Sequence, residues 1–503
     1  MKNLFLLVML FSVTLLHAQA PEIEWQKSLG GSGEDVATSI QQTSDGGYIV
    51  AGYSYSNDGD ISNSHGNADY WIVKLDHAGN IQWEKSMGGS STELAYFVQQ
   101  TSDSGYIVAG ESSSNDGDVS GNHGSEDYWI VKLDDAGNLQ WQKSLGGSST
   151  EVAYSIQQTS DGGYIVAGES SSNDGDVTEN HGESDCWIVK LDHIGNIQWE
   201  KSLGGSENDW ASSIQQTSDG GYIIGGTSRS NDGDVSGNHG DYDYWIAKLD
   251  NVGNLQWQKS LGGSFPDYLE CIQQTLDSGY IVVGESFSND GDVSESHRGR
   301  GDYWVVKLDN AGNIQWEKAL GGSGQDWAYS ISQTSDGGFI IAGWAESQDG
   351  DVSGNHGAED YWIVKLDNAG NLQWQRSIGG SSTEVAYSIQ QTTDGGYIVA
   401  GYSDSHDGDI NEYHGNGDFW IIKFTGSVGL NETINNTIFS VYPNPATDLL
   451  TVKGIFPKTE VDITNMRGET VLRTVAKDNE LTIDVSKLSA GMYFINGQKF
   501  IKK

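Results

Sequence analysis

The sequence predicts an all-β protein, a seven-bladed β-propeller followed by a small Ig-like β-sandwich. Three observations predict this fold: a unit of about 58 residues occurs seven times, each unit holds four short strand-like segments, and the array begins and ends on incomplete units. A tryptophan-rich unit of four strands at such a period is typical of a propeller blade.

Residues 1–20 have the features of a secretory signal peptide. Lys2 gives a positive start, an apolar run follows over residues 4–16, and Ala18-Gln19-Ala20 forms a small-residue cleavage region. Cleavage after Ala18 and cleavage after Ala20 both fit. The apolar run is too short to span a membrane, and no other stretch approaches the ~18 apolar residues that a spanning helix needs. We therefore expect an exported protein without a transmembrane segment.

Two tryptophan series define the repeat, which we assign to a propeller domain over residues 21–425. The first series, in the pattern W-[EQ]-[KR]-[SA]-[LMI]-G-G, is Trp25, Trp83, Trp141, Trp199, Trp257, Trp316 and Trp374. The second series is Trp71, Trp129, Trp187, Trp245, Trp304, Trp362 and Trp420. Consecutive members of both series keep a nearly constant spacing, and a single step in each, at Trp316 and at Trp304, is longer by one position.

Each unit predicts four antiparallel strands. In the first complete unit they cover residues 37–43, 48–54, 70–75 and 81–87, which are rich in β-branched and aromatic residues and separated by Gly, Asp, Asn and Ser. No helical periodicity occurs. If the first strand is the innermost, the long loop between the second and third strands lies on the same face as the G-G-S connection between units. All seven long loops then surround one mouth of the central channel.

The two ends of the array predict a closed ring. Residues 22–29 match the fourth strand of a unit without its first three, and residues 419–424 match the third strand without its fourth. We expect the N-terminal strand to complete the last blade, because pairing would remove the open edge that a linear array leaves.

The repeat resembles a known bacterial family. Its consensus, SLGGSxxD…SIQQTSDGGYIVAGYS…DYWIVKLDxxGN, is similar to β-propeller units that read YLGGSxxD…DxxGNxYVxGxT…DAFVAKLxxxG. The resemblance extends over the whole array of seven units. It implies a propeller and does not imply one activity.

The composition changes after the repeats. Residues 426–438 (GSVGLNETINNTI) are predicted to be a linker, and residues 439–503 to form the sandwich. Within that segment the stretches YPNPATD, NMRG, LSAGMY and KFIKK resemble the type A C-terminal sorting domain of the type IX secretion system of Bacteroidota. Its sorting-motif positions here are Pro443, Asn444, Pro445, Gly491 and Tyr493. The resemblance implies partnership with that secretion machinery, periplasmic passage, and secretion or display on the outer cell surface.

Charge and cysteine content limit the possible partners. The net charge is −43, from 27 basic and 70 acidic residues, and nucleic-acid binding needs the opposite, a basic surface. Cys186 and Cys271 each occur in one unit only, where the other units mostly carry Tyr or Ser, so they do not predict a disulfide framework.

The long loops carry a repeated D-G-D pair. It consists of Asp58 and Asp60, Asp116 and Asp118, Asp174 and Asp176, Asp232 and Asp234, Asp290 and Asp292, Asp349 and Asp351, and Asp407 and Asp409. Asp and Gly are residues that tight turns need, which is one explanation. Calcium is the other, because it takes oxygen ligands and D-x-D spacing lets two carboxylates reach one ion. A repeated histidine, His65 to His414, is expected to anchor the loop by a hydrogen bond.

Seven identical loops are expected to be scaffold, since a catalytic centre needs one asymmetric set of groups. Candidate binding residues therefore lie where the repeat is broken: Trp210, Arg229, Tyr268, Arg298, Arg300, Trp327 and Trp344. Exposed aromatic residues and arginines are favoured at recognition surfaces. The sequence favours a monomeric extracellular binding or adhesion protein, with a glycan or protein ligand, over an enzyme. The alternative is a glycan-active hydrolase or lyase with its site at the channel mouth.

Overall fold

A computed structural model describes residues 19–294, 299–426, 440–442, 445–453, 460–465, 470–478, 480–489, 491–495 and 498–503. The chain divides into two compact units, Met1–Ser427 and Val428–Lys503. The predicted signal peptide, apart from Gln19 and Ala20, and nearly all of the predicted linker lie outside the described residues.

The first unit contains seven antiparallel sheets of four strands, which we number as blades 1 to 7. The first strands of the blades are β2 (Asp35–Gln42), β6 (Glu93–Gln100), β10 (Glu151–Gln158), β14 (Asp209–Gln216), β18 (Asp267–Gln274), β22 (Asp326–Gln333) and β26 (Glu384–Gln391). The second strands are β3 (Tyr48–Ser54), β7 (Tyr106–Ser112), β11 (Tyr164–Ser170), β15 (Tyr222–Ser228), β19 (Tyr280–Ser286), β23 (Phe339–Ala345) and β27 (Tyr397–Ser403).

The third strands are β4 (Asp69–Leu75), β8 (Asp127–Leu133), β12 (Asp185–Leu191), β16 (Asp243–Leu249), β20 (Asp302–Leu308), β24 (Asp360–Leu366) and β28 (Asp418–Phe424). The fourth strands of blades 1 to 6 are β5 (Ile81–Met87), β9 (Leu139–Leu145), β13 (Ile197–Leu203), β17 (Leu255–Leu261), β21 (Ile314–Leu320) and β25 (Leu372–Ile378). Blade 7 takes its fourth strand from the start of the array, β1 (Ile23–Leu29).

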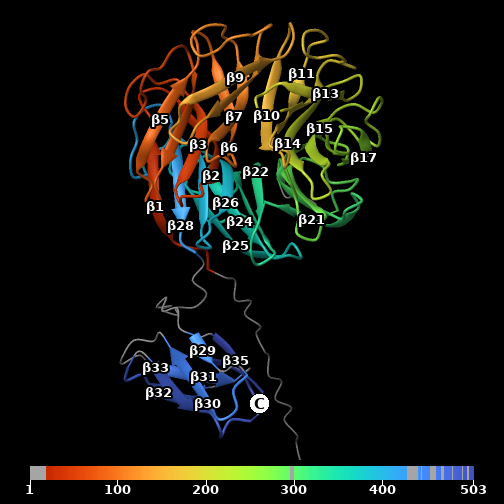
Figure 1. Ribbon diagram of the computed structural model, residues 1–503. Coiled ribbons are helices and arrows are strands. Elements are labelled where there is room, and N and C mark those ends of the chain that lie inside the picture. Colours follow the sequence, from red (N-terminus) through yellow and green to blue (C-terminus); the bar gives the residue numbers. More distant parts are fainter. Residues whose placement is uncertain are drawn as a thin grey trace, which may run out of the picture. The chain divides into compact units, whose positions relative to one another are not determined.

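The strand order confirms the predicted closure. β1 pairs with β28, with Trp25 opposite Lys423 and Leu29 opposite Phe419. The first strand of each blade contacts the first strands of both neighbouring blades, so that these seven strands surround the channel (Figure 1). The structure is thus the expected seven-bladed propeller with strand exchange at the seam.

Side-chain hydrogen bonds join neighbouring blades on the face of the S-D-G-G turns. The backbone N–H of Ser44 donates to the Gln100 side chain of blade 2 at 2.8 Å, and equivalent bonds follow from blade to blade. The last bond of the ring runs from the N–H of Thr393 to Gln42, also at 2.8 Å. The same hydrogen bond therefore joins the blades at every junction, including the seam between blades 7 and 1.

The core lies between consecutive blades. The second and third strands are continuous apolar runs such as YIVAG and DYWIV, and they are buried on both faces, as central strands packed between sheets must be. The third-strand tryptophans are fully buried. Tyr70 packs against Trp129 of the next blade and donates its hydroxyl to the Trp129 carbonyl at 2.9 Å. Each core cluster therefore contains residues of adjacent blades.

The second unit holds two small sheets, β29 (Ser440–Tyr442), β30 (Leu449–Lys453) and β33 (Glu480–Asp484) in one, and β31 (Glu460–Asn465), β32 (Thr470–Val475), β34 (Gly491–Ile495) and β35 (Gln498–Lys502) in the other. Leu450 and Ile483 of the first sheet share a buried core with Ile463, Ile495 and Phe500 of the second. This arrangement is a small β-sandwich, as expected.

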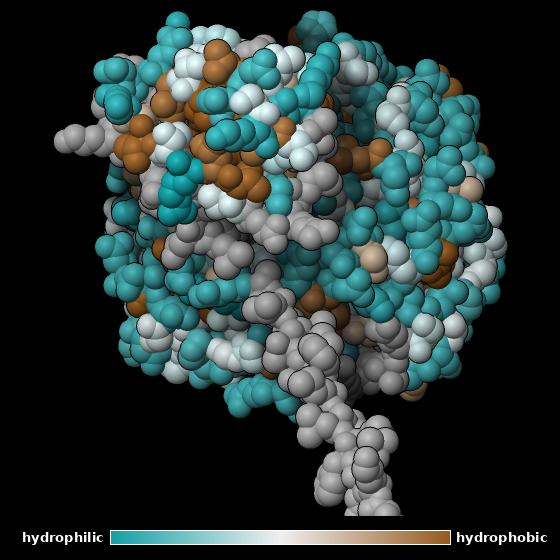
Figure 2. Space-filling model, turned by 90° about the horizontal axis from the view of Figure 1, so that it is seen from below, coloured by the Kyte–Doolittle hydropathy of each residue, from teal (hydrophilic) through white to brown (hydrophobic). Residues whose placement is uncertain are grey.

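Hydrophilic residues cover most of the face shown in Figure 2, and the apolar residues on it form one group at the upper left and smaller spots elsewhere. This surface agrees with the net charge of −43, since most charged side chains must remain in water. Among the described residues, no helix is long and apolar enough to cross a membrane.

Candidate binding site in the central channel

The D-G-D carboxylates hold the backbone of the neighbouring G-G-S connection. Asp58 accepts the N–H of Ser32 at 2.7 Å, and Asp60 accepts the N–H of Gly30 at 3.2 Å. The first carboxylate makes the same bond in all seven blades. Within the described ranges, no three His, Cys, Asp or Glu residues are grouped as a metal ion would require. Calcium binding by these pairs stays a prediction.

Beneath each long loop lies a pair of fully buried carboxylates from adjacent blades. In the first pair, Asp69 accepts the Ser86 hydroxyl at 2.9 Å, and Glu93 accepts the Ser112 hydroxyl at 2.8 Å and the N–H of Gly89 at 2.7 Å. A Cβ at Gly88 would lie 2.4 Å from Asp69 Oδ1 and 2.5 Å from Glu93 Oε2. Only glycine leaves room for both carboxylates there.

One oxygen of this pair has no hydrogen-bond donor. It is Oδ1 of Asp69, and the same oxygen is buried without a partner at Asp127, Asp185, Asp243, Asp360 and Asp418. Burial also raises the pKa of the second carboxyl of the pair, to about 6 at Asp35, Asp267 and Asp326, although serine hydroxyls and a glycine N–H oppose the shift. These junctions therefore favour a bound proton at mildly acidic pH.

The repeated histidine is a loop anchor where the structure describes it. Nδ1 of His123 lies 2.7 Å from Oδ2 of Asp127, and His181, His239, His356 and His414 have the same partner at 2.6 to 3.1 Å. His65 lies 3.4 Å from Asp69, and His297 is outside the described residues. The carboxylates and histidines of the loops thus form hydrogen bonds mainly with one another and with the backbone.

A different set of residues faces the channel. The first strand of every blade carries a β-bulge, seen as a register shift such as that between Leu269 and Cys271. A bulge leaves one residue unpaired and turns its side chain out of the regular alternation. The seven bulged residues are Thr38, Tyr96, Tyr154, Ser212, Glu270, Tyr329 and Tyr387, and all of them line one cavity.

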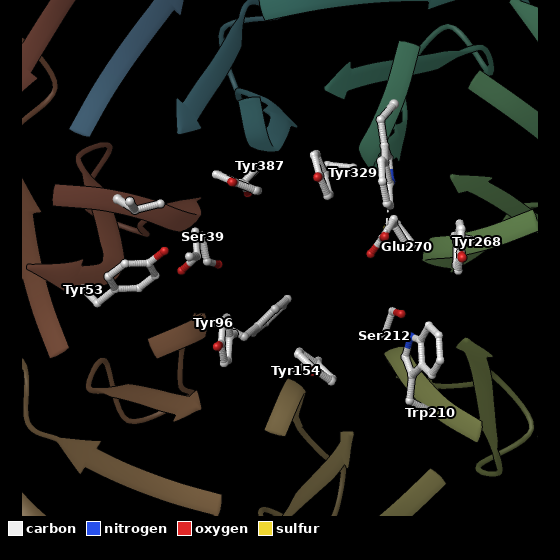
Figure 3. A pocket seen from close by; sticks show the side chains of 17 residues that line it. Ser39, Tyr53, Tyr96, Tyr154, Trp210, Ser212, Tyr268, Glu270, Tyr329 and Tyr387 are labelled. Carbon is white, nitrogen blue, oxygen red and sulfur yellow. Dashed lines mark hydrogen bonds between the residues drawn. The ribbon is translucent and has the colours of Figure 1, made fainter. Parts of the chain in front are cut away.

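The cavity occupies the channel with a volume of about 510 Å³, and aromatic rings form much of its wall (Figure 3). Three consecutive rings in blades 5 and 6 are stacked: Tyr268 on Trp327 at 5.8 Å, and Trp327 on Tyr329 at 5.7 Å between ring centroids. Trp210 of blade 4 stacks on Tyr268 at 6.4 Å. Blades 4 to 6 therefore present a continuous aromatic surface.

Glu270 is the carboxyl group among the described residues that line this cavity. It is half-buried, points into the channel in Figure 3, and accepts the indole N–H of Trp327 at 3.2 Å. Burial raises the pKa of Glu270 to about 8, while the bond from Trp327 acts in the opposite direction. The carboxyl is therefore mostly protonated at neutral pH when the cavity holds no cation.

Behind Glu270 lies Glu285, which is fully buried. Its Oε1 accepts the side-chain amide of Gln325 at 2.8 Å, and its Oε2 is buried without a partner. Burial raises the pKa of Glu285 to about 8; the hydrogen bond from Gln325 opposes the shift, and the charges of Glu270 and other nearby acids add to it. Blade 5 thus contains two carboxyls of raised pKa, one facing the cavity and one behind it.

The structure brings together three of the seven predicted binding residues, because Trp210, Tyr268 and Trp327 all line the cavity. Trp344 does not line it; it pairs with Trp327 across the sheet and is 9% exposed.

The arginines lie elsewhere. Arg229 is exposed, with its Nε 2.9 Å from Asp241 and its guanidinium over the ring of Tyr242. Arg300 is exposed, and its backbone N–H donates to the Gly324 carbonyl at 2.9 Å. Arg298 lies outside the described residues.

The sequence reasoning missed the bulge residues, including Glu270. The signal that could have found them is the fourth residue of each first strand, which reads Thr, Tyr, Tyr, Ser, Glu, Tyr and Tyr along the array. It varies from blade to blade, as does the second residue of the same strand, which supplies Trp210, Tyr268 and Trp327. Only the bulge, however, shows that this position faces the channel.

The remaining predicted positions are partly described. Tyr493 of the sorting motif donates its hydroxyl to the Ser489 carbonyl at 3.0 Å and stacks on Phe500. Pro445 and Gly491 are described, whereas Pro443 and Asn444 lie outside the described residues. Cys186 and Cys271 are both free thiols.

Comparison with protein families identifies the second unit. Residues 440–502 match the secretion system C-terminal sorting domain. Regulatory protein FlaEY of Caulobacter vibrioides is 26% identical over 194 residues, which cover 35% of this chain and 20% of that protein. The matched region thus spans about a fifth of that relative.

Several solved structures are similar at low identity. The Neurospora crassa Pan2 WD40 domain has a TM-score of 0.43 at 12% identity, covering 83% of this chain and 99% of that one. A Dyadobacter fermentans protein of unknown function has 0.42 at 10%, covering 80% and 98%. YCF48 bound to D1 peptide has 0.41 at 9%, covering 81% and 99%. The assignment of the fold rests on the strand pairing described above.

Two findings describe the chain. Strands β1 to β28 pair into seven blades that close into a ring, and residues 440–502 match the sorting domain. The sorting domain marks its bearer for the type IX secretion machinery, which delivers proteins to the cell surface or the extracellular space. This chain is a seven-bladed β-propeller that carries a type IX secretion system C-terminal sorting domain.

Proposed function

We propose that the propeller is an extracellular binding or adhesion module that recognises a glycan or protein ligand at the mouth of its channel. One observation carries this proposal: the stacked aromatic surface of Trp210, Tyr268 and Trp327 breaks the sevenfold repeat on the channel wall. Half-buried aromatic rings give large contact areas to sugar rings and to apolar side chains at low entropic cost. The D-G-D carboxylates of the loop face are engaged in their own hydrogen bonds.

The test is to remove these rings in the full-length protein. The triple variant Trp210→Ala, Tyr268→Ala, Trp327→Ala should bind its ligands on a glycan array, or on immobilised extracellular proteins, at least about tenfold more weakly. Tyr55→Ala is the matched control, because Tyr55 is 46% exposed and does not line the cavity. A triple variant that melts like the wild type and binds equally well would contradict the proposal.

A second candidate function is glycan cleavage, which Glu270 favours. A carboxyl with a pKa of about 8 is protonated at neutral pH, as a general acid must be. Cleavage by the usual mechanism needs a second carboxyl about 5 to 10 Å away that also reaches the sugar, and Glu285 lies behind the wall. Release of reducing sugar from polysaccharides, abolished in Glu270→Gln, would favour the enzyme.

A further inference from the structure

The cavity wall has a distinct charge composition. Nine aromatic side chains line it, among them Tyr96, Tyr154, Tyr268, Trp327 and Tyr329. Glu270 supplies a carboxyl, and none of the described lining residues is Lys, Arg or His. An anionic ligand would therefore meet no compensating charge, whereas a cation would meet a carboxyl and the electron-rich faces of several rings.

Comparison with blades 2 and 3 shows what is unusual about blade 5. In those blades the bulged residue is a tyrosine whose hydroxyl donates to a glutamate on the second strand, Tyr154 to Glu169 at 2.9 Å and Tyr96 to Glu111 at 3.4 Å. In blade 5 the tyrosine is replaced by Glu270, and the glutamate in the second strand is Glu285. A carboxyl thus takes the place of the phenol that donates a hydrogen bond to the second-strand glutamate in blades 2 and 3.

This replacement has two consequences. Glu285 keeps an oxygen that is buried without a donor, so blade 5 has unsatisfied acceptor capacity. The channel also gains space, because glutamate is smaller than tyrosine, and the bulged residue of blade 4 is the small Ser212. Positive charge in this space would offset both carboxyls.

We propose that the channel binds an organic cation, a protonated or methylated amine, with its charge on the Glu270 carboxylate and its carbon atoms against the rings of Trp327, Tyr329 and Tyr268. The amine would be the end group of the glycan or protein that the loop face recognises, so the inference rests on the proposed function. Aromatic walls with one carboxylate suit such cations, because ring quadrupoles attract them without requiring full desolvation.

Binding should be coupled to proton release. Burial raises the pKa of Glu270 to about 8, so a cation must displace the proton of the neutral acid below that pH. The titratable groups that interact with Glu270 from the surrounding strands are Glu285, Tyr244, Cys271, Tyr329 and Tyr387. Burial raises the pKa of the tyrosines and of Cys271 above their usual values, so Glu270 and Glu285 are the groups of this set that titrate between pH 6.5 and 8.5.

The experiment uses choline as the cationic probe and 3,3-dimethyl-1-butanol as its uncharged isostere, with full-length protein and calorimetry at pH 6.5, 7.5 and 8.5. Choline affinity should rise about tenfold or more over this range, as the carboxyl ionises. The uncharged isostere should bind at least about tenfold more weakly at pH 8.5. Quenching of tryptophan fluorescence gives a second readout, because Trp327 donates to the same carboxyl.

Three variants sharpen the test. Glu270→Gln should lose the affinity for choline and its pH dependence, and Glu270→Tyr, which restores the residue of blades 2 and 3, should fold and not bind choline. Glu169→Gln is the matched control, since Glu169 lies behind Tyr154, and it should bind like the wild type. Equal binding of the isostere, or choline binding that survives Glu270→Gln, would overturn the inference.

The result separates the inference from the proposed function. One outcome is that choline fails to bind while ligands on the glycan or protein array bind to the wild type and not to the triple aromatic variant. That result would overturn the inference of a cation site and support the proposed binding function. If no ligand depends on the three aromatic residues, the proposed function fails.

Discussion

Two sets of positions in the propeller differ in what their side chains do, although both occur seven times. The acids of the long loops, such as Asp58 and Asp60, accept hydrogen bonds from the backbone of the neighbouring G-G-S connection. The bulged residues, such as Glu270 and Tyr329, point into a cavity and differ from blade to blade. Repetition therefore marks the scaffold, and variation at a fixed structural position marks the candidate site.

The largest expected effect is the difference in stability loss between a tryptophan of the repeated framework and one that lines the cavity. Trp187→Ala should lower the free energy of unfolding by about 3 to 5 kcal/mol, because Trp187 is fully buried in the repeated framework. Trp210→Ala should cost less than about 1.5 kcal/mol, because Trp210 is half-buried at the cavity, and it should weaken ligand binding instead. Denaturant unfolding of both variants checks this. Equal losses of stability would mean that Trp210 is also scaffold.

The next prediction concerns the buried carboxyl pairs. The folded-state pKa of Asp35, Asp267 and Asp326 is about 6, above the ordinary value of 3.8, so the folded state binds more protons than the unfolded state between these values. Their contribution to stability is fully present below pH 3.8 and is lost as the pH rises through about 6, on the order of 2 to 3 kcal/mol per group.

Acids whose pKa is lowered in the folded state reduce stability at low pH instead. Burial opposes the shift, but hydrogen bonds with Thr43 and Lys74 lower the pKa of Asp45 to about 2, so its contribution is lost as the pH falls through that value. Thermal melts should therefore show greatest stability near pH 4 and a decline from there to about pH 6. Asp267→Asn should flatten the decline. A melting temperature that rises steadily from pH 4 to 7 would contradict the assignment.

The smallest expected effect distinguishes the two explanations of the D-G-D loops. If their carboxylates serve mainly as backbone acceptors, a chelator should shift the melting temperature at pH 7 by less than about 1 °C. A clear drop that calcium restores and magnesium does not would instead establish calcium loops. Asp58→Asn and Asp290→Asn, made separately, would then locate the effect.

The sequence determined the architecture because architecture follows from periodicity. The constant spacing of the tryptophans, the four apolar segments per unit and the incomplete ends predicted seven blades and the pairing of β1 with β28, and both are confirmed. The predicted strands differ from the observed ones mainly at their ends; β2, for instance, begins at Asp35 and not at the predicted Ala37. The motifs after Ile438 likewise identified the sorting domain.

The tertiary structure decided where the candidate site lies. A β-bulge in each first strand turns one residue toward the channel, and the sequence carries no separate mark for it, because a one-residue shift changes the face of a side chain without changing the composition. Trp210, Tyr268 and Trp327 could be selected as departures from the repeat. Glu270 is also a departure from the repeat, but its importance depends on which way it points and on the buried Glu285 behind it, and both follow from how the seven blades close around the channel.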